Sequence, residues 1–184
     1  MSSSSNIRLS DYFMMVPEAD RYQWVGRSTN AEGLVLANVR QGPVASTWNP
    51  LSVEWLAETR DRPHCDFPIF HPIVRCISNR ACEALGWQLR GSMELLPLQG
   101  LAGEYVGAHC IRWLDAACFD GIDLNRVSVN STLFVPTLRA ESIDGNDIFG
   151  IREMITKVFV SEKVRQIIES NELVGCEFHR VPLC

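Results

Sequence analysis

The residues best suited to chemistry gather between positions 64 and 82, where histidine, cysteine and aspartate side chains occur together. They are His64, Cys65, Asp66, His71, Cys76 and Cys82. A zinc site needs about four such ligands converging in a tetrahedron, and structural sites usually draw them from closely spaced pairs. The spacing here is irregular, and Cys82 falls in the core of a predicted helix. The pattern therefore favours structural roles, and no metal is expected.

The same stretch offers a candidate cysteine nucleophile, which requires surroundings that stabilise its thiolate. Cys65 follows His64 directly, but neighbouring side chains of an extended chain point in opposite directions, so this pair supplies no imidazole to the sulfur. His71 or His109 could approach Cys65 only through the tertiary fold. A small cytosolic enzyme with a thiol or metal centre near His64, Cys65 and His71 therefore stays open as an alternative.

Acidic side chains form two further groups, at positions 115–123 and 141–147. A hydrolytic carboxyl pair requires one member to be desolvated, so that its pKa rises. Both groups include turn-forming pairs such as Asp-Gly and Asn-Asp, for which a solvated surface is usual. The second group, Glu141, Asp144 and Asp147, is instead predicted to face a basic partner protein and to steer its approach.

Composition and charge narrow the possible partners. The chain has 184 residues, of which 46% are hydrophobic and 21% charged, as is ordinary for a globular protein with a real core. Its net charge of -5 disfavours nucleic-acid binding, which usually needs a basic surface. No apolar run approaches the roughly 20 residues that span a bilayer, and the N-terminus lacks the pattern of a signal peptide. We expect a cytoplasmic protein without a membrane partner.

Motifs for cofactors do not stand out either. Neither a glycine-rich phosphate loop nor a metalloprotease or hydrolase motif occurs, so no cofactor is expected. The seven cysteines are odd in number and mostly have apolar neighbours, which predicts buried, reduced thiols. The five tryptophans are interpreted as core and edge anchors, although tryptophan is also enriched at protein interfaces.

Short strands and a few helices are predicted to position these residues. A helix is expected after Asn49, which could cap it, with Pro50 at the first helical position and an end before Pro63. Segment 62–72 holds three prolines in eleven residues and is predicted to be an ordered loop. Strands are expected at 11–16, 21–25, 34–36, 73–77, 93–98, 105–113, 131–136, 148–151 and 157–160.

Two stretches share one layout, in which an apolar run is followed by serine, a helix, glycine and a second apolar run. They are residues 73–98, with Ser78 as helix cap and Gly86 as helix end, and residues 158–181, with Ser161 as cap. Serine is a common cap after any strand, so the layout alone does not establish a duplication.

The whole pattern predicts a serine-rich disordered tip at 1–9. Residues 10–184 are then expected to form one α+β domain with a mixed, mainly antiparallel sheet and a few short helices packed on it.

The closing segment, residues 158–181, is similar to the closing pattern of a bacterial immunity-protein family of polymorphic toxin systems, family eleven in that scheme and formerly a domain of unknown function. Residues 63–85 resemble its middle signature, a proline-rich loop with an aspartate before Ile-Ser-x-x-Ala-x-x-Ala-Leu. Phe149 and Asp115 match two further positions. Gly150 and Val174 depart from the pattern, where arginine and threonine would be expected. The likeness covers about residues 48 to 181.

The resemblance implies a protein that binds and neutralises a cognate toxin inside the producing cell. It carries over no catalytic residue, and the protein is therefore expected not to be an enzyme. Such a function needs a preformed surface of roughly 800 Å² per partner with a few anchor residues. The enzyme alternative and a housekeeping scaffold protein remain the competing classes.

Overall fold

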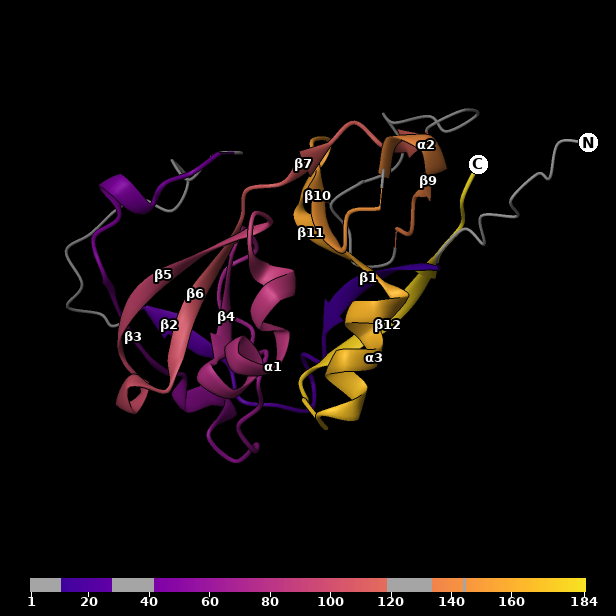
Figure 1. Cartoon of the computed structure of the whole chain (residues 1–184). Coiled ribbons are helices and arrows are strands. Elements are labelled where there is room, and N and C mark those ends of the chain that lie inside the picture. Colours follow the sequence, from indigo (N-terminus) through magenta and orange to yellow (C-terminus); the bar gives the residue numbers. More distant parts are fainter. Residues whose placement is uncertain (1–10, 28–41, 119–133, 144) are drawn as a thin grey trace, which may run out of the picture.

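The computed structural model describes residues 11–27, 42–118, 134–143 and 145–184. It consists of two five-stranded sheets, a small two-stranded sheet and short helices (Figure 1). Most strand pairs are antiparallel, so the α+β class predicted from the sequence is confirmed. The predicted tip at 1–9 and the predicted strand at 34–36 lie outside the described residues.

Strands make up most of the secondary structure, and helices interrupt them at a few places along the chain. The strands are β1 (Tyr12–Pro17), β2 (Val25–Arg27), β3 (Leu51–Trp55), β4 (Val74–Ser78), β5 (Met93–Gly100), β6 (Tyr105–Cys110), β7 (Trp113–Leu114), β8 (Ala117–Cys118), β9 (Thr137–Leu138), β10 (Ile148–Ile151), β11 (Met154–Ser161) and β12 (Cys176–Val181). The α-helices are α1 (Asn79–Leu89), α2 (Ala140–Ile143) and α3 (Glu162–Ser170), and single turns of 3-10 helix are η2 (Ala45–Thr47), η3 (Ala57–Thr59) and η4 (Leu101–Gly103).

The two larger sheets are built around the same arrangement. One sheet has the order β12-β1-β11-β10-β7 and the other β2-β3-β5-β6-β4. In the first, β1 lies between β11 and β12 and is antiparallel to both. In the second, β6 lies between β4 and β5 and is antiparallel to both. Helix α1 therefore connects β4 to β5, and helix α3 connects β11 to β12, two parallel strands separated by a third in each case, which is a split βαβ arrangement.

We call β4, α1 and β5 the first unit, and β11, α3 and β12 the second unit. Helices α1 and α3 pack against each other in front of the sheets (Figure 1). One hydrophobic core joins the units. It includes Phe13 and Val160 from one sheet, Ile77 from the other, and Leu85 and Ile168 from the two helices. The shared layout seen in the sequence thus extends to strand order and helix packing.

Serine caps begin both helices, as predicted. The Ser78 hydroxyl accepts a hydrogen bond from the Ala81 amide at 3.0 Å, and the Ser161 hydroxyl accepts one from the Val164 amide at 3.4 Å. Each bond satisfies an amide of the first turn that has no partner within its helix. The sequence therefore located both helix starts correctly.

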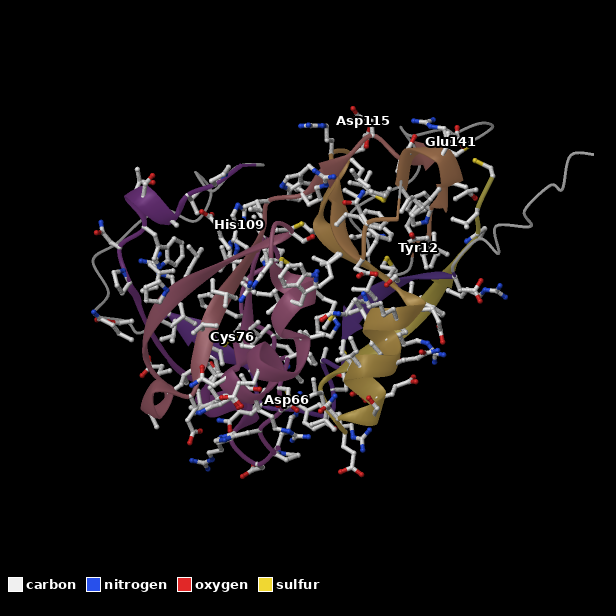
Figure 2. The ribbon with its side chains drawn as sticks, viewed as in Figure 1. Tyr12, Asp66, Cys76, His109, Asp115 and Glu141 are labelled. Atoms are coloured by element: carbon white, nitrogen blue, oxygen red, sulfur yellow. The ribbon has the colours of Figure 1, made fainter. Side chains whose placement is uncertain are left out.

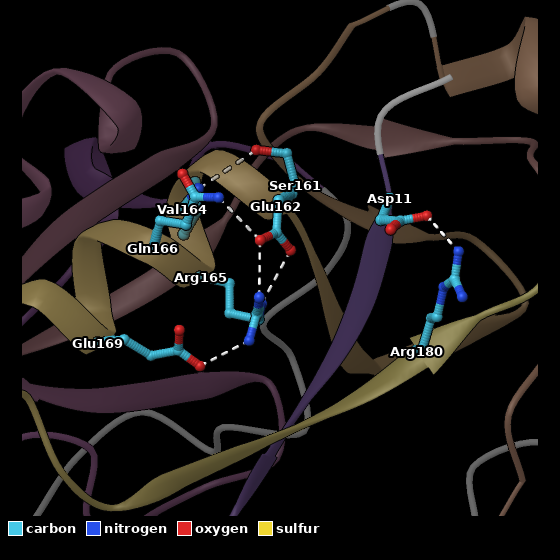
Figure 3. Close-up of polar contacts among 8 residues, drawn as sticks. All are labelled: Asp11, Ser161, Glu162, Val164, Arg165, Gln166, Glu169 and Arg180. Atoms are coloured by element: carbon cyan, nitrogen blue, oxygen red, sulfur yellow. Dashed lines mark hydrogen bonds and ion pairs between the residues drawn. The ribbon is translucent and has the colours of Figure 1, made fainter. Parts of the chain in front are cut away.

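Ionic contacts also order the exposed side of α3 (Figure 3). Arg165 donates to both carboxylate oxygens of Glu162, at 2.8 and 2.7 Å, and to Glu169 at 2.7 Å. Pairs spaced three and four residues apart face each other on a helix and stabilise it modestly. Arg180 on β12 bonds Asp11 at 2.6 Å, which adds a polar contact between the ends of β12 and β1.

The helix predicted after Asn49 is wrong, because residues 51–55 form strand β3. Leu51 and Val53 are buried while Glu54 is exposed, an alternation with a period of two that suits a half-buried strand. Strand β3 pairs in parallel with β5 and antiparallel with β2. The Asn-Pro helix signal is local, and pairing with two distant strands overrides it.

Smaller corrections concern the ends of elements. The strand predicted at 21–25 begins only at Val25, and residues 134–136 lie outside any strand, with β9 starting at Thr137. Gly86 interrupts α1, as predicted for a helix stop: its φ of 25° is not helical, and a second helical segment continues beyond this kink to Leu89. The remaining predicted strands match β1, β4, β5, β6, β10 and β11 to within a few residues. The segment at 62–72 is a loop without a helix or strand, as predicted.

Candidate functional site

Asp66, one of the residues considered for chemistry, supports the start of helix α1. Its side chain is buried, and it accepts hydrogen bonds from the Ser78 hydroxyl at 2.6 Å and from the Val174 amide at 2.9 Å. Arg80 approaches the same carboxylate at 3.8 Å and donates to the carbonyls of Asn171 and Glu172 beyond α3. This network ties the first unit to the turn of the second unit.

Asp147, predicted as a partner contact, has the corresponding place at helix α3. Its carboxylate accepts from the Ser161 hydroxyl at 2.7 Å and pairs with Lys163 at 2.9 Å. Its backbone carbonyl accepts from the Ser161 amide at 2.9 Å, as the Asp66 carbonyl does from the Ser78 amide at 2.9 Å. The Asp147 carboxylate is therefore committed to contacts within the chain.

The other two residues of the predicted acidic site are Glu141 and Asp144. Glu141 is exposed on the short helix α2, where a polar turn or loop was predicted, and Asp144 lies outside the described residues. Asp115 is also exposed, and its carboxylate pairs with Arg152 at 3.4 Å. Figure 2 shows Glu141 and Asp115 at one end of the molecule and Asp66 at the other.

The structure separates His64, Cys65 and His71, the residues of the alternative enzyme hypothesis. The His64 ring is exposed and stacks on Trp55, with ring centroids 4.0 Å apart. Nδ1 of His71 accepts a hydrogen bond from the Ile73 amide at 3.2 Å, and burial lowers the pKa of this imidazole. Each histidine thus has its own local contact.

Cys65 is buried under the first unit, and the Tyr105 hydroxyl donates to its backbone carbonyl at 3.0 Å. Desolvation raises the pKa of its thiol to about 12, which keeps the sulfur protonated near neutral pH, where a nucleophile needs to be a thiolate. Among the described residues, no three histidine, cysteine or acidic side chains are grouped closely enough to hold a metal ion.

Trp87 was not anticipated as a surface residue. It is 72% exposed on α1, directly after the kink at Gly86, whereas Leu85 and Leu89 on either side are buried. The Arg90 guanidinium lies 5.1 Å from the centre of its ring, an exposed cation–π pair. The sequence did contain one signal of this exposure: Trp87 follows a glycine in an amphipathic helix and lies outside the apolar stripe of that helix.

An open hollow of about 370 Å³ lies beside Trp87. Its lining includes Arg90, Met93 and Leu95, and Leu95 on β5 is itself 46% exposed. Exposed tryptophan and arginine next to a hollow are typical of protein-binding surfaces, in which Trp and Arg are enriched among the residues that dominate affinity. We call these residues, Trp87, Arg90, Met93 and Leu95, the Trp87 surface.

A second, deeper cavity of about 320 Å³ opens where β1 parts from β11. Strand β1 pairs with β11 as far as Met15 opposite Val158, but it continues beside β12 to Pro17 opposite Cys176. The loop 67–72 and strand β4 contribute the facing wall. The walls are mostly apolar, and their cationic side chains are Arg75 and Lys157. We call this space the β1–β11 cavity.

The comparisons with known proteins assign no family. No family model matches the chain, and a search of curated proteins found no significant match. In the part of the chain that the structure describes, every helix is too short or too polar to cross a membrane.

Proposed function

We propose that this protein acts by binding another protein, and that the partner is a cognate bacterial toxin which it neutralises. The observation that carries the binding proposal is the Trp87 surface. A helix kink holds a large aromatic side chain 72% exposed, next to an arginine, an exposed leucine and a hollow. The choice of a toxin as partner rests on the sequence resemblance to immunity proteins at residues 63–85 and 158–181.

Physical chemistry supports this assignment of the surface. An exposed indole has apolar area that water solvates poorly, and contact with a partner removes that area from water. The side chain is also rigid compared with lysine or glutamate, so little conformational freedom is lost on binding. The Arg90 guanidinium, which lies over the Trp87 ring, would form part of the polar rim of such a contact.

The test needs a candidate toxin domain, which we expect the gene immediately upstream of this protein's gene to encode. We expect this protein to form a stable complex with that domain and to restore growth of cells that express it. Replacing Trp87 with alanine should weaken the complex by about 2 kcal/mol, or roughly 30-fold, as for a central anchor residue. The affinity is measured by calorimetry on the purified proteins.

The matched control is Ile155→Ala, which removes another exposed hydrophobic side chain, 38% exposed on β11 and outside the Trp87 surface. Both variants should keep the thermal unfolding midpoint of the wild type within a few degrees, because surface substitutions usually change stability by less than about 0.5 kcal/mol. Equal affinity of the Trp87→Ala variant and the wild type would remove the Trp87 surface from the proposal. Failure of the wild type to bind or protect would reject the toxin as partner.

The predicted acidic contact at Glu141 and Asp144 is tested in the same assay. Reversal of both charges should slow association, and the effect should be larger at low salt than at high salt, because exposed charges are screened over about 10 Å at 0.1 M salt. Asp147 is left intact, since its carboxylate supports helix α3. Unchanged association rates would exclude this region as a contact.

A further inference from the structure

The charges in the wall of the β1–β11 cavity are unusual for a mostly apolar space. Arg75 donates from Nη2 to the Thr156 carbonyl at 2.8 Å, and its Nε is buried without a hydrogen-bond partner among the described residues. The side chains that line the cavity, all within the described part of the chain, include no aspartate or glutamate. Burial of a guanidinium without a carboxylate lowers the stability of the fold, because the loss of hydration is not offset by an ion pair.

Two other basic side chains line the same space. Lys157 is buried and donates from Nζ to the Phe134 carbonyl, and desolvation lowers the pKa of its amine to about 8. His71 accepts a bond from the Ile73 amide through Nδ1. The polar part of the wall is thus basic, while Met14, Met15 and the loop 67–70 supply apolar surface.

We propose that the β1–β11 cavity binds a small organic anion with an apolar tail, a medium-chain carboxylate, whose carboxylate pairs with Arg75. A guanidinium presents a planar fork of donors that matches a carboxylate in two parallel hydrogen bonds. Nε itself is fully enclosed, so the carboxylate of such a ligand would meet the part of the guanidinium that lines the cavity. This binding is independent of the Trp87 surface and of the proposed toxin partner.

The volume sets the length of the tail. About 320 Å³ lies at the lower end of the range for small-molecule pockets, roughly 300–1,000 Å³. It equals the liquid volume of about ten water molecules at roughly 30 Å³ each. A carboxylate with a chain of about eight carbons has about the same number of non-hydrogen atoms and therefore has a suitable size. Octanoate is therefore the probe, octan-1-ol is the probe without charge, and acetate is the probe without a tail.

The experiment is calorimetric titration of the whole protein with each probe at pH 7. Octanoate should bind with a stoichiometry of one, and octan-1-ol and acetate should bind at least about tenfold more weakly, since each lacks one of the two interactions. Arg75→Gln, which keeps a donor for Thr156 but removes the charge, should weaken octanoate binding by about tenfold or more. The matched control is Arg60→Gln, an exposed arginine outside both this cavity and the Trp87 surface, which should leave octanoate affinity unchanged.

A second variant covers the case in which Arg75→Gln does not fold, as judged by circular dichroism. Ile69→Trp adds bulk to the cavity wall from a half-buried position in the loop and should abolish octanoate binding while Arg75 remains. Equal affinity for octanoate and octan-1-ol, no octanoate binding at millimolar concentration, or full affinity in either cavity variant would overturn the proposal. None of these results bears on toxin binding, which is measured separately with the Trp87→Ala variant.

Discussion

The first and second units begin their helices with the same set of contacts but hold them in different surroundings. Serine caps the helix, and an aspartate bonds the serine through both its backbone carbonyl and its carboxylate. A basic residue two positions after each serine, Arg80 or Lys163, faces that carboxylate. The amide that follows each serine bonds the residue before the central strand, Glu104 or Asp11, at 2.8 and 2.9 Å.

Burial distinguishes the two aspartates. The Asp66 side chain is 7% exposed and also binds the Val174 amide of the second unit, whereas the Asp147 side chain is 28% exposed and bonds Ser161 and Lys163 of its own unit. The same local motif therefore serves two purposes. At Asp147 it starts a helix, and at Asp66 it starts a helix and joins the two units. Equivalent substitutions in the two units should reveal this difference.

The largest effect is expected from Asp66→Ala. It removes the partner of the Ser78 hydroxyl and the Val174 amide in a buried site, so we expect a loss of about 3 kcal/mol or more in unfolding free energy. Asp147→Ala should cost about 1 kcal/mol, because water can replace part of its contacts. Urea denaturation of both variants measures the difference. Equal losses would contradict the role of Asp66 in joining the units.

The glycines before the second strand of each unit provide the next comparison. Gly175 has a φ of 104°, and an added Cβ would lie 2.5 Å from the Cys65 sulfur, whereas Gly91 has a φ of 73° and open space around it. Gly175→Ala should cost about 2–4 kcal/mol from backbone strain and overpacking together. Gly91→Ala should cost about 1–2 kcal/mol from backbone strain alone. Thermal unfolding in parallel with the wild type measures both, and a smaller loss at position 175 would contradict the close contact with Cys65.

The serine caps should differ less. Ser161→Ala should lower the unfolding free energy by about 1 kcal/mol, the usual value for a lost helix cap. Ser78→Ala should lower it by about 2 kcal/mol, because it also removes a hydrogen bond from the buried Asp66 carboxylate. The double variant Ser78→Ala with Asp66→Ala tests the explanation: the two losses should be less than additive, since both remove the same bond.

Stability at the joint between the units should also depend on pH. Burial raises the pKa of Cys65 from 9.0 to about 12, so the unfolded chain loses this thiol proton first as the pH rises. Stability should therefore fall as pH rises from about 9 toward 12, with the full contribution present below pH 9. Other buried thiols act in the same direction, among them Cys110, whose pKa burial raises to about 11. Cys65→Ala should make the decline between pH 8 and about 10.5 less steep in urea denaturation, and an unchanged slope would contradict this assignment.

Much of the fold was predictable from patterns that act over short distances. Ser78 and Ser161 after apolar runs located both long helices, because a cap depends on the few amides that follow it. The prolines at 62–72 excluded regular structure for a similarly local reason. The prediction at residues 51–62 was wrong because Asn49 and Pro50 are also compatible with an extended chain, and the choice depended on strands β2 and β5.

The candidate sites were less predictable. Asp147 was interpreted as a surface contact because its neighbours are polar, but its carboxylate serves Ser161, which is 14 residues away in sequence. Trp87 was interpreted as an anchor, since tryptophan is usually buried, and only the packing of α1 shows that it faces outward. The β1–β11 cavity is formed by segments from both halves of the chain, so no local pattern predicts it.

By itself, the amino-acid sequence determined the α+β class, the two capped helices and most of the strands, because propensity, capping and hydrophobic alternation are properties of neighbouring residues. Only the tertiary structure decided that Asp66 joins two similar units, that Trp87 is exposed and that Arg75 lines a cavity to which the described residues contribute no acidic side chain. These features depend on which distant segments meet, and burial, long-range strand pairing and the balance of charge within a cavity exist only after the chain has folded.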